Sequence, residues 1–249
     1  MGKYIKSFLL MLQFMTRIPI NINLPCEQED FRRGTIFLPL VGAVIGLIQW
    51  LIYFVLIQRL PMTITAVFVV LTGVLLTGAL HVDGLGDSCD GFFAFKGKDR
   101  IIEIMKDSRI GTYACIAVVF DILIKITSLS CINDTRTALI IIAVPIIGRA
   151  SLVTISFIGN TAKKTGSGNL FIGNVGKIEI SAALIIAAAL VFLLVGIEKG
   201  SILIAASLIL TFLFNKFCRS KIDGITGDNL GANNELNEIL VLVLFIAMN

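Results

Sequence analysis

The chain has 249 residues and a formal net charge of +4, with 56% hydrophobic and 15% charged residues. Soluble domains carry about 25% charged residues, and the mean hydropathy here is +0.92. This composition excludes an ordinary soluble domain, and so small a positive charge gives no support to a nucleic-acid partner. It predicts an all-α, polytopic integral membrane protein whose first partner is the lipid bilayer.

The first twenty residues, MGKYIKSFLLMLQFMTRIPI, combine a basic start with an apolar stretch. No small-residue cleavage site follows, so the segment does not match a signal peptide. Its apolar part is interrupted by Gln13, Thr16 and Arg17. We therefore expect a retained helix that lies in the membrane interface or is partly inserted.

Seven apolar segments follow that are long enough, or nearly so, for a bilayer core requiring about 20 residues per helix. Short alternating stretches, which are typical of membrane-spanning strands, are missing from the sequence. We predict a single membrane-embedded domain over residues 1–249, with about seven spans at roughly 36–58, 61–80, 111–130, 138–158, 180–197, 200–214 and 236–248.

The basic residues indicate how the spans are oriented. Lys and Arg gather before the first predicted span and in the long, glycine-rich connections 81–110, 159–179 and 215–235. The shorter connections between the other spans carry only three basic residues, Arg59, Arg136 and Lys199. Because cytoplasmic loops carry the excess of Lys and Arg, we expect a cytoplasmic N-terminus in the cell membrane. The three long connections would then form the active face in the cytoplasm.

Three aspartates recur in the segment HVDGLGDSCDG. Asp83, Asp87 and Asp90 stand at i, i+4 and i+7, which places them within about a 60° arc of one helical face. Three unpaired carboxylates this close would repel one another, so the pattern predicts a divalent cation. All-oxygen ligands suit magnesium, manganese or calcium. An ordinary solvated loop is the alternative, but aspartate alone on one face near a bilayer favours a metal site.

The glycines between these aspartates suggest access for a ligand. Gly84, Gly86 and Gly91 leave the backbone unshielded, so a bulky anionic group could approach it closely. We therefore expect Gly84 and Gly91 to lie beside the substrate.

Residues 99–109, DRIIEIMKDSR, predict a short amphipathic helix with Asp99 as its N-cap. Lys106 and Arg109 lie beside Asp107 in this segment. Carboxylates for a metal next to cations for phosphate oxygens are typical of phosphoryl transfer. Ordinary charge pairing on an interfacial helix is the other interpretation.

Other polar residues give weaker evidence of a functional role. His81, the only histidine, stands at a helix end, where a structural role is the commoner one. Arg149, inside a span, is expected to meet a carboxylate or an anion, and Asp121 and Lys125 are expected to pair with each other. Asp228 lies in DGITGDNLGANNE, whose glycine-rich turns either bind phosphate through backbone N–H groups or serve as a flexible connection.

Several of these motifs occur together in one known family. HVDGLGDSCDG, EIMKDSRIGT and GITGDNLGANNEL, with the Arg of PIIGRA and the TRIP segment at 16–19, resemble the adenosylcobinamide-GDP ribazoletransferase family, also called cobalamin synthase. The resemblance covers essentially the whole chain. It implies a magnesium-dependent membrane enzyme of late cobalamin biosynthesis. Such an enzyme joins adenosylcobinamide-GDP to α-ribazole, or its 5'-phosphate, and releases GMP. A homo-oligomeric assembly is compatible with this resemblance.

The resemblance also suggests roles for the residues above. Magnesium at the three aspartates would clamp the GDP pyrophosphate, and the cations would neutralise the leaving group. Asp107 is the preferred general base, and another carboxylate such as Asp87 is the alternative. The expected assignments are metal ligands Asp83, Asp87 and Asp90, and substrate contacts Lys106, Arg109, Arg149, Gly84, Gly91 and Asp228.

The chain departs from the family pattern at two places. Gly86 replaces an alanine of the usual DGLAD core, and Phe92, Phe93 and Phe95 stand where many members have glycines. The three rings could anchor the segment in the interface or pack on the corrinoid.

Two other classes of protein deserve comparison. A CDP-alcohol phosphotransferase also uses aspartates and glycines across two spans. Its motif places an Ala-Arg pair soon after the first Asp-Gly and ends in two aspartates four apart, whereas here the aspartates come first and the Arg follows. A cation-coupled secondary transporter would place its carboxylates near the midplane within repeated halves, whereas this cluster lies at a span–loop boundary with no matching half.

Overall fold

The computed structural model describes residues 2–94, 97–132, 134–163 and 165–249. Within these residues the protein is helical, with one isolated bridge between Thr161 and Ile225. The α-helices are α1 (Lys3–Met15), α2 (Gln28–Gly34), α3 (Leu38–Leu56), α4 (Met62–Thr77), α5 (Leu80–Phe93), α6 (Lys98–Ile104), α7 (Thr112–Ser130), α8 (Ile140–Ile158), α9 (Lys177–Val195), α10 (Ile197–Ile222) and α11 (Gly227–Ala247). Three 3-10 turns are η1 (Thr35–Phe37), η2 (Thr137–Leu139) and η3 (Ser167–Leu170).

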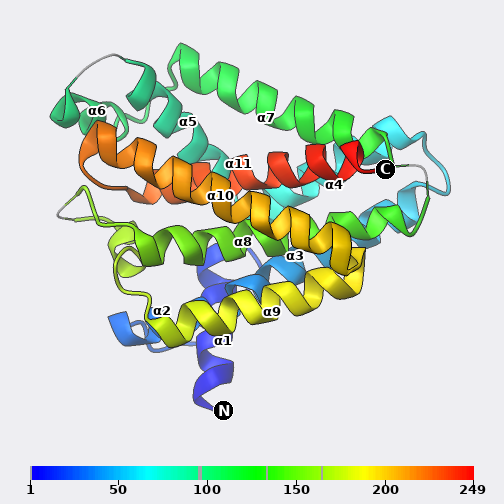
Figure 1. The fold of residues 1–249 in the computed structure, drawn as a ribbon, viewed down its shortest axis with the longest axis horizontal. Coiled ribbons are helices and arrows are strands. Elements are labelled where there is room, and N and C mark those ends of the chain that lie inside the picture. The colour runs from blue at the N-terminus through cyan, green and yellow to red at the C-terminus, as the bar shows by residue number, and fades with distance from the viewer. Residues whose placement is uncertain (1, 95–96, 133, 164) are drawn as a thin grey trace.

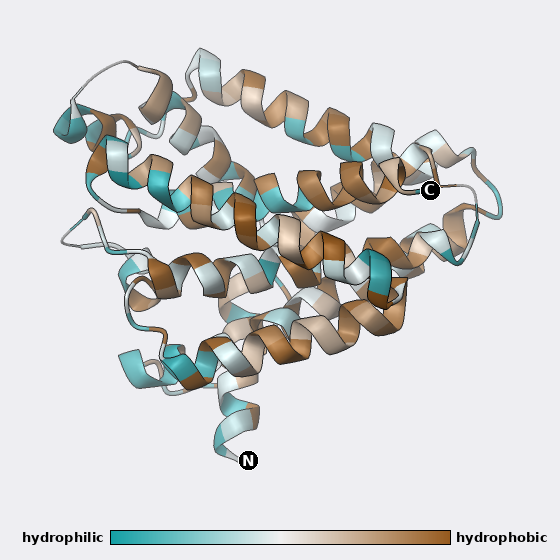
Figure 2. Ribbon diagram, viewed as in Figure 1, coloured by the Kyte–Doolittle hydropathy of each residue, from teal (hydrophilic) through white to brown (hydrophobic). Residues whose placement is uncertain are grey.

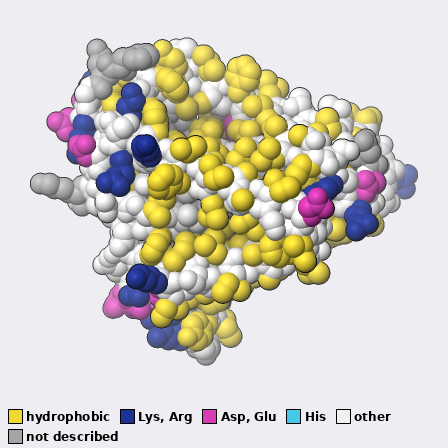
Figure 3. All heavy atoms as spheres, in the orientation of Figure 1, with side chains coloured by type: hydrophobic (Ala, Val, Ile, Leu, Met, Phe, Trp, Pro, Cys, Tyr) yellow, Lys and Arg dark blue, Asp and Glu magenta, His cyan; other side chains and the backbone are white. Residues whose placement is uncertain are grey.

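The long helices form a bundle with the dimensions and polarity of a membrane protein. Among the described residues, six helices are long and apolar enough to cross a bilayer, and the bent pair α4–α5 would make a seventh crossing. Figure 1 shows α7 to α11 running along the same axis. Apolar residues cover their length (Figure 2), and charged side chains gather towards the two ends of the molecule (Figure 3). The prediction of an all-α, multi-pass membrane protein is confirmed.

The second predicted span is not one straight helix. The expected helix 61–80 breaks after Thr77, and α5 leaves α4 at an angle of 88°. Gly78 and Ala79 both adopt left-handed backbone angles, each with φ of 60°, which only glycine adopts without strain. The backbone N–H of Arg17 donates to the carbonyl oxygen of Leu76 at 2.7 Å. The segment after α1 is therefore docked on the break.

The helix that follows the break carries the aspartate motif. α5 covers Leu80–Phe93, so the helical spacing inferred for the three aspartates is correct. The next helix differs from the prediction of 99–109, because α6 ends at Ile104. Its N-cap position is Gly97 rather than Asp99.

The polar connection predicted at 215–235 is mostly helix. α10 continues to Ile222 and α11 begins at Gly227, which leaves four residues between them. A capping box starts α11: the Thr226 hydroxyl accepts from the Asn229 N–H at 3.4 Å, and the Asn229 side-chain oxygen accepts from the Thr226 N–H at 2.9 Å. The prediction of a loop was wrong because it relied on low hydropathy, whereas these polar side chains are buried and hydrogen-bonded to neighbouring helices.

Helices α3 and α8 approach each other closely at two glycines of α3. A Cβ atom built on Gly42 would lie 2.3 Å from the carbonyl oxygen of Pro145, and one on Gly46 would lie 2.7 Å from Cα of Ile142. Small residues allow such contacts between helices in a membrane, where van der Waals packing is the main attraction. This pair places α8, which is buried along nearly its whole length, at the centre of the molecule.

We expect Gly42→Ala to destabilise the protein, because the added methyl group meets backbone atoms of α8 that cannot move aside. Overpacking of this kind costs about 1–3 kcal/mol. Thermal unfolding in detergent should show a lower midpoint for Gly42→Ala. The matched control is Gly97→Ala, since a Cβ there meets no atom of the described residues within 4 Å. Equal midpoints for the two variants would contradict the close approach.

Candidate active site

A polar hollow lies beside the break between α4 and α5. It has a volume of about 440 Å³ and includes Arg17, from the segment after α1, and Asp83, from the first turn of α5. Its remaining lining residues are Gln13, Phe14, Thr16, Thr77, Gly78, Ala79 and Leu80. A cation and a carboxylate therefore share one cavity. Arg17 was not predicted as a site residue, because its proximity to Asp83 depends on how the N-terminal segment docks.

Asp87, one helical turn after Asp83, is surrounded by charges from three parts of the chain. Asp83, Asp228 and Asp90 are all close enough to act on it electrostatically, as is Lys163. Asp228 lies in the first turn of α11 and accepts from the Lys163 ammonium group at 2.8 Å. The structure thus brings the predicted residue Asp228 next to the aspartate motif, and it adds Lys163, which the sequence did not single out.

Asp90 has a different role from the other two aspartates. One of its carboxylate oxygens accepts from the Gly111 N–H at 2.6 Å, and the other accepts from the Ala114 N–H at 2.9 Å. Both groups belong to the start of α7, where the first N–H groups of a helix lack partners within it. Asp90 therefore anchors α7 to α5, and both of its oxygens are engaged.

The carboxylates are suited to magnesium in chemistry, although they do not form a closed cage. Among the described residues, no three His, Cys, Asp or Glu side chains converge as a metal-binding group. In the same part of the chain, the side-chain carboxylates of Asp83 and Asp87 have neither a hydrogen bond nor an ion pair, in contrast to Asp228, which pairs with Lys163. Magnesium is usually held by one or two carboxylates and completes its shell with water and substrate phosphates. Asp83 and Asp87 meet that requirement.

The glycines of α5 pack against helices rather than leave the backbone open, contrary to our expectation. A Cβ on Gly84 would lie 2.6 Å from the Asp228 carbonyl oxygen, and one on Gly91 would lie 2.7 Å from the Met105 side chain. A Cβ on Gly86 would lie 3.3 Å from the Cβ of Ala114 in α7. Three small residues let α5 approach α11, α6 and α7, so the predicted substrate contacts at Gly84 and Gly91 are replaced by helix packing.

Lys106, Asp107 and Arg109 lie outside the hollow, in the segment after α6. The Arg109 guanidinium donates to Asp107 at 2.6 and 3.0 Å, and this hydrogen bonding lowers the pKa of Asp107 to about 2. Within the described residues, no hydrogen bond or ion pair joins these three side chains to Asp83 or Asp87. A carboxylate with so low a pKa is a weak proton acceptor, which disfavours Asp107 as the base.

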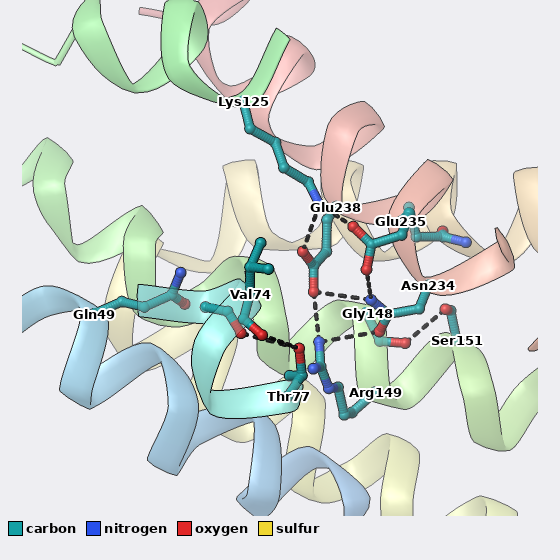
Figure 4. A network of polar contacts seen from close by, with 12 residues as sticks. Gln49, Val74, Thr77, Lys125, Gly148, Arg149, Ser151, Asn234, Glu235 and Glu238 are labelled. Carbon is teal, nitrogen blue, oxygen red and sulfur yellow. Dashed lines mark hydrogen bonds and ion pairs between the residues drawn. The ribbon is translucent and has the colours of Figure 1, made fainter. Parts of the chain in front are cut away.

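Arg149 belongs to a buried ion network in the body of the bundle (Figure 4). It is 2% exposed and donates to Glu238 at 2.5 Å and to Asn234 at 3.1 Å. Lys125 lies 3.1 Å from both Asp121 and Glu238 and also pairs with Glu235. The expected pairing of Asp121 with Lys125, and of Arg149 with a carboxylate, is confirmed. This network lines a separate cavity of about 50 Å³ rather than the hollow.

The phenylalanines after the aspartate motif divide between two environments. Phe92 is buried and packs edge-on against Phe217 of α10, with ring centroids 5.1 Å apart. Phe93 is half exposed beside Tyr113, and Phe95 lies outside the described residues. Packing on α10 thus accounts for Phe92, while Phe93 keeps an open face.

Helices long enough to cross a membrane, together with a hollow lined by one carboxylate and one cation, define a polytopic membrane protein with a site suited to phosphate groups. The family model described as cobalamin-5-phosphate synthase matches residues 7–246, and the chain belongs to this family.

Known relatives agree with this family over their full length. The chain is 51% identical to an adenosylcobinamide-GDP ribazoletransferase of Clostridium tetani, covering 99% of this chain and 98% of the relative. It is 53% identical to one of Clostridium kluyveri, covering 98% and 97%, and 46% identical to one of Clostridium botulinum, covering 99% of each. No solved structure matches the chain.

We expect Glu238→Gln to destabilise the protein strongly, because it removes the carboxylate shared by Lys125 and Arg149 in an apolar environment. Breaking a buried ion pair costs about 3–5 kcal/mol. Thermal unfolding in detergent measures the loss. Glu103→Gln is the control, since Glu103 pairs with Arg100 where both side chains are more than half exposed, and such pairs contribute about 0–1 kcal/mol. A Glu238→Gln protein as stable as the control would argue against the network.

Proposed function

We propose that this chain transfers the adenosylcobinamide phosphate group from adenosylcobinamide-GDP to α-ribazole, or to its 5'-phosphate, and releases GMP in late cobalamin biosynthesis. The observation that carries the proposal is family membership over residues 7–246, combined with a hollow that holds Arg17 and Asp83 beside the aspartate motif. The relatives named above bear the corresponding enzyme name over their whole length.

The reaction is a displacement at phosphorus. A ribose hydroxyl of the ribazole attacks the phosphorus attached to cobinamide and forms a new P–O bond. The bond from that phosphorus to the bridging oxygen of the diphosphate breaks, and GMP leaves with that oxygen. The hydroxyl proton passes to a carboxylate of the protein. Catalysis of this kind depends mainly on positioning and on stabilising charge on the phosphate oxygens.

In this proposal, residues of the hollow and of the neighbouring helices divide these tasks. Arg17 and Lys163 would bind phosphate oxygens, and an arginine can do so through two parallel hydrogen bonds. Magnesium, held by Asp83 and Asp87, would neutralise charge on the diphosphate. Asp87 and Asp228, which interact electrostatically, are the carboxylates that could take the proton. In this proposal Asp90 supports the site by holding α7.

The other two classes of protein receive less support. Neither a CDP-alcohol phosphotransferase nor a cation-coupled transporter accounts for the full-length match to the cobalamin-5-phosphate synthase family. Asp83 also follows directly after the α4–α5 break, and the described residues contain no second, matching half.

We also propose that the hollow faces the cytoplasm from the cell membrane. The basic residues predicted to be cytoplasmic include Arg17, Lys163 and Arg219. Of these, Arg17 lines the hollow, and Lys163 donates to Asp228. The donor carries a charged GDP group, so a site at the cytoplasmic end of the helices would give it access from water.

Purified protein in liposomes should release GMP only when adenosylcobinamide-GDP and α-ribazole are both present. Removal of magnesium with EDTA should abolish this release, and added magnesium should restore it, because the diphosphate charge would otherwise be unneutralised. GMP and cobalamin are measured by chromatography. Full activity after chelation would rule out the proposed magnesium role, and no cobalamin at any magnesium level would rule out the proposed function.

Asp87→Asn should reduce turnover at least 100-fold, in line with the contribution of a positioned catalytic group, without lowering the unfolding midpoint. Asp107→Asn, which alters an exposed carboxylate outside the hollow, should keep turnover within about twofold of the unmodified protein. Rates of GMP release under saturating magnesium test both. An inactive Asp107→Asn variant together with an active Asp87→Asn variant would contradict these roles.

A further inference from the structure

Three asparagines on one side of α11 link this helix to three other helices. They lie four residues apart, and all three are buried. Each shares a hydrogen bond with a hydroxyl group of a different helix: Asn229 with Ser88 of α5, Asn233 with Ser151 of α8, and Asn237 with Ser207 of α10. Hydrogen bonds between polar side chains hold helices together in membrane proteins. The first link differs from the other two, because it joins the residues that directly follow Asp87 and Asp228.

The Asn229–Ser88 hydrogen bond is buried, whereas the two neighbouring carboxylates are not. The Asn229 side-chain nitrogen donates to the Ser88 hydroxyl at 2.9 Å. Ser88 is 2% exposed and Asn229 is 0% exposed, while Asp87 and Asp228 are partly exposed. Successive residues of a helix point about 100° apart. The buried pair therefore joins α5 to α11, and the carboxylates lie at the edge of this contact.

The start of α11 determines how the Asn229 amide group is oriented. Its oxygen accepts from the Thr226 N–H at 2.9 Å, and only an oxygen can accept there, so the nitrogen faces Ser88. The Thr226 hydroxyl donates to Asp228 Oδ2 at 3.1 Å, and the Lys163 ammonium group donates to the same atom at 2.8 Å. One chain of hydrogen bonds thus runs from Ser88 through Asn229 and Thr226 to the Asp228 carboxylate.

The glycines at the α5–α11 contact set the separation of the two helices but not their register. A Cβ on Gly84 would lie 2.6 Å from the Asp228 carbonyl oxygen, and one on Gly231 would lie 3.0 Å from the His81 carbonyl oxygen. Such van der Waals contacts hold the backbones close, yet they resist sliding or rotation of one helix along the other only weakly. A hydrogen bond depends on direction as well as distance. The Asn229–Ser88 hydrogen bond therefore fixes the register of the two helices.

This register also relates two neighbouring cavities. Asp83 lines the hollow, and Asp228 lines a second cavity of about 100 Å³. Phe14 and Leu80 line both cavities, so the two lie side by side. A shift of α11 along α5 would move Asp228 and the second cavity relative to the aspartates of α5.

We propose that Ser88 and Asn229 are positioning residues for the transfer reaction, which hold Asp87 and Asp228 in the relative placement that the reaction requires. The inference rests on the proposed function, in which Asp83 and Asp87 hold magnesium and the hydroxyl proton passes to Asp87 or Asp228. Because these carboxylates belong to two helices, their placement depends on the register of α5 and α11. Ser88 and Asn229 are buried and act through the carboxylates beside them.

Steady-state kinetics of the full chain in liposomes test this inference. Asn229→Ala and Ser88→Ala should each lower kcat for GMP release about 10–100-fold, the usual effect of losing a residue that orients a functional group. The KM values for both substrates should stay close to those of the unmodified protein, because neither buried side chain contacts a substrate. Ser88→Ala leaves the capping box of α11 intact, so it provides the result if Asn229→Ala does not fold.

Asn233→Ala and Ser151→Ala are matched controls, since they remove a buried amide–hydroxyl hydrogen bond of the same length, 2.9 Å, from the same helix. Their thermal unfolding midpoints should fall about as far as that of Ser88→Ala. Their kcat should stay close to that of the unmodified protein, because they loosen α11 from α8 and not from α5. Equal kcat losses in all four variants, or unchanged kcat in Asn229→Ala and Ser88→Ala, would overturn the inference.

A double-mutant cycle tests whether the two residues act as one unit. The variant that combines Ser88→Ala with Asn229→Ala should have the kcat of Asn229→Ala alone, because both changes break the same hydrogen bond. Losses that add in free energy would mean that the residues act separately, contrary to the inference.

Binding of Mn²⁺, followed by electron paramagnetic resonance without substrate, gives a measurement that does not depend on turnover. Asp83 and Asp87 both belong to α5, so Asn229→Ala should leave the Mn²⁺ affinity unchanged, whereas Asp87→Asn should lower it. A lower affinity in Asn229→Ala would place its effect within α5 and overturn the inference. If the unmodified protein binds Mn²⁺ but releases no GMP, the proposed function itself fails, and the inference fails with it.

Discussion

The buried ion network between α7, α8 and α11 is the constraint on which the arrangement of the bundle depends. Lys125 and Arg149 cannot stay charged in an apolar interior without partners, and Glu235 and Glu238 of α11 provide them. Because the partners come from different helices, their contacts determine how α11 lies against α7 and α8. The first turn of the same helix carries Asp228. The network in the interior thereby helps to position the polar site at the end of the bundle.

The break at Gly78 and Ala79 is the second structural feature that shapes the site. A continuous helix would carry the aspartate motif along the axis of α4. The 88° bend instead turns α5 across α11, to which Gly84 and Gly231 allow close approach. The N-terminal segment occupies the outside of the bend and brings Arg17 there. Left-handed geometry at Ala79 is unfavourable, and it persists because the packing around the bend holds it.

The two cavities differ in the kind of ligand that each can stabilise. The hollow presents charge from Arg17 and Asp83, which suits a diphosphate and a metal ion. The neighbouring cavity is lined mainly by apolar and aromatic side chains, among them Phe14, Leu80 and Phe171. Asp228 also lines this cavity and interacts electrostatically with Asp87. Asp90 stabilises the start of α7.

The sequence by itself determined the class of protein, most of the spans and the helical register of the three aspartates, because hydropathy and periodicity are local properties. It also identified the pairing of Asp121 with Lys125, which lie one turn apart. The structure alone decided that Gly84 and Gly91 serve helix packing, that Asp90 anchors α7, and that the polar residues after Gly227 form a buried helix. It also brought Arg17 to Gly78 and Lys163 to Asp228. These contacts join residues far apart in the chain, and their free energy depends on neighbours that local patterns do not specify.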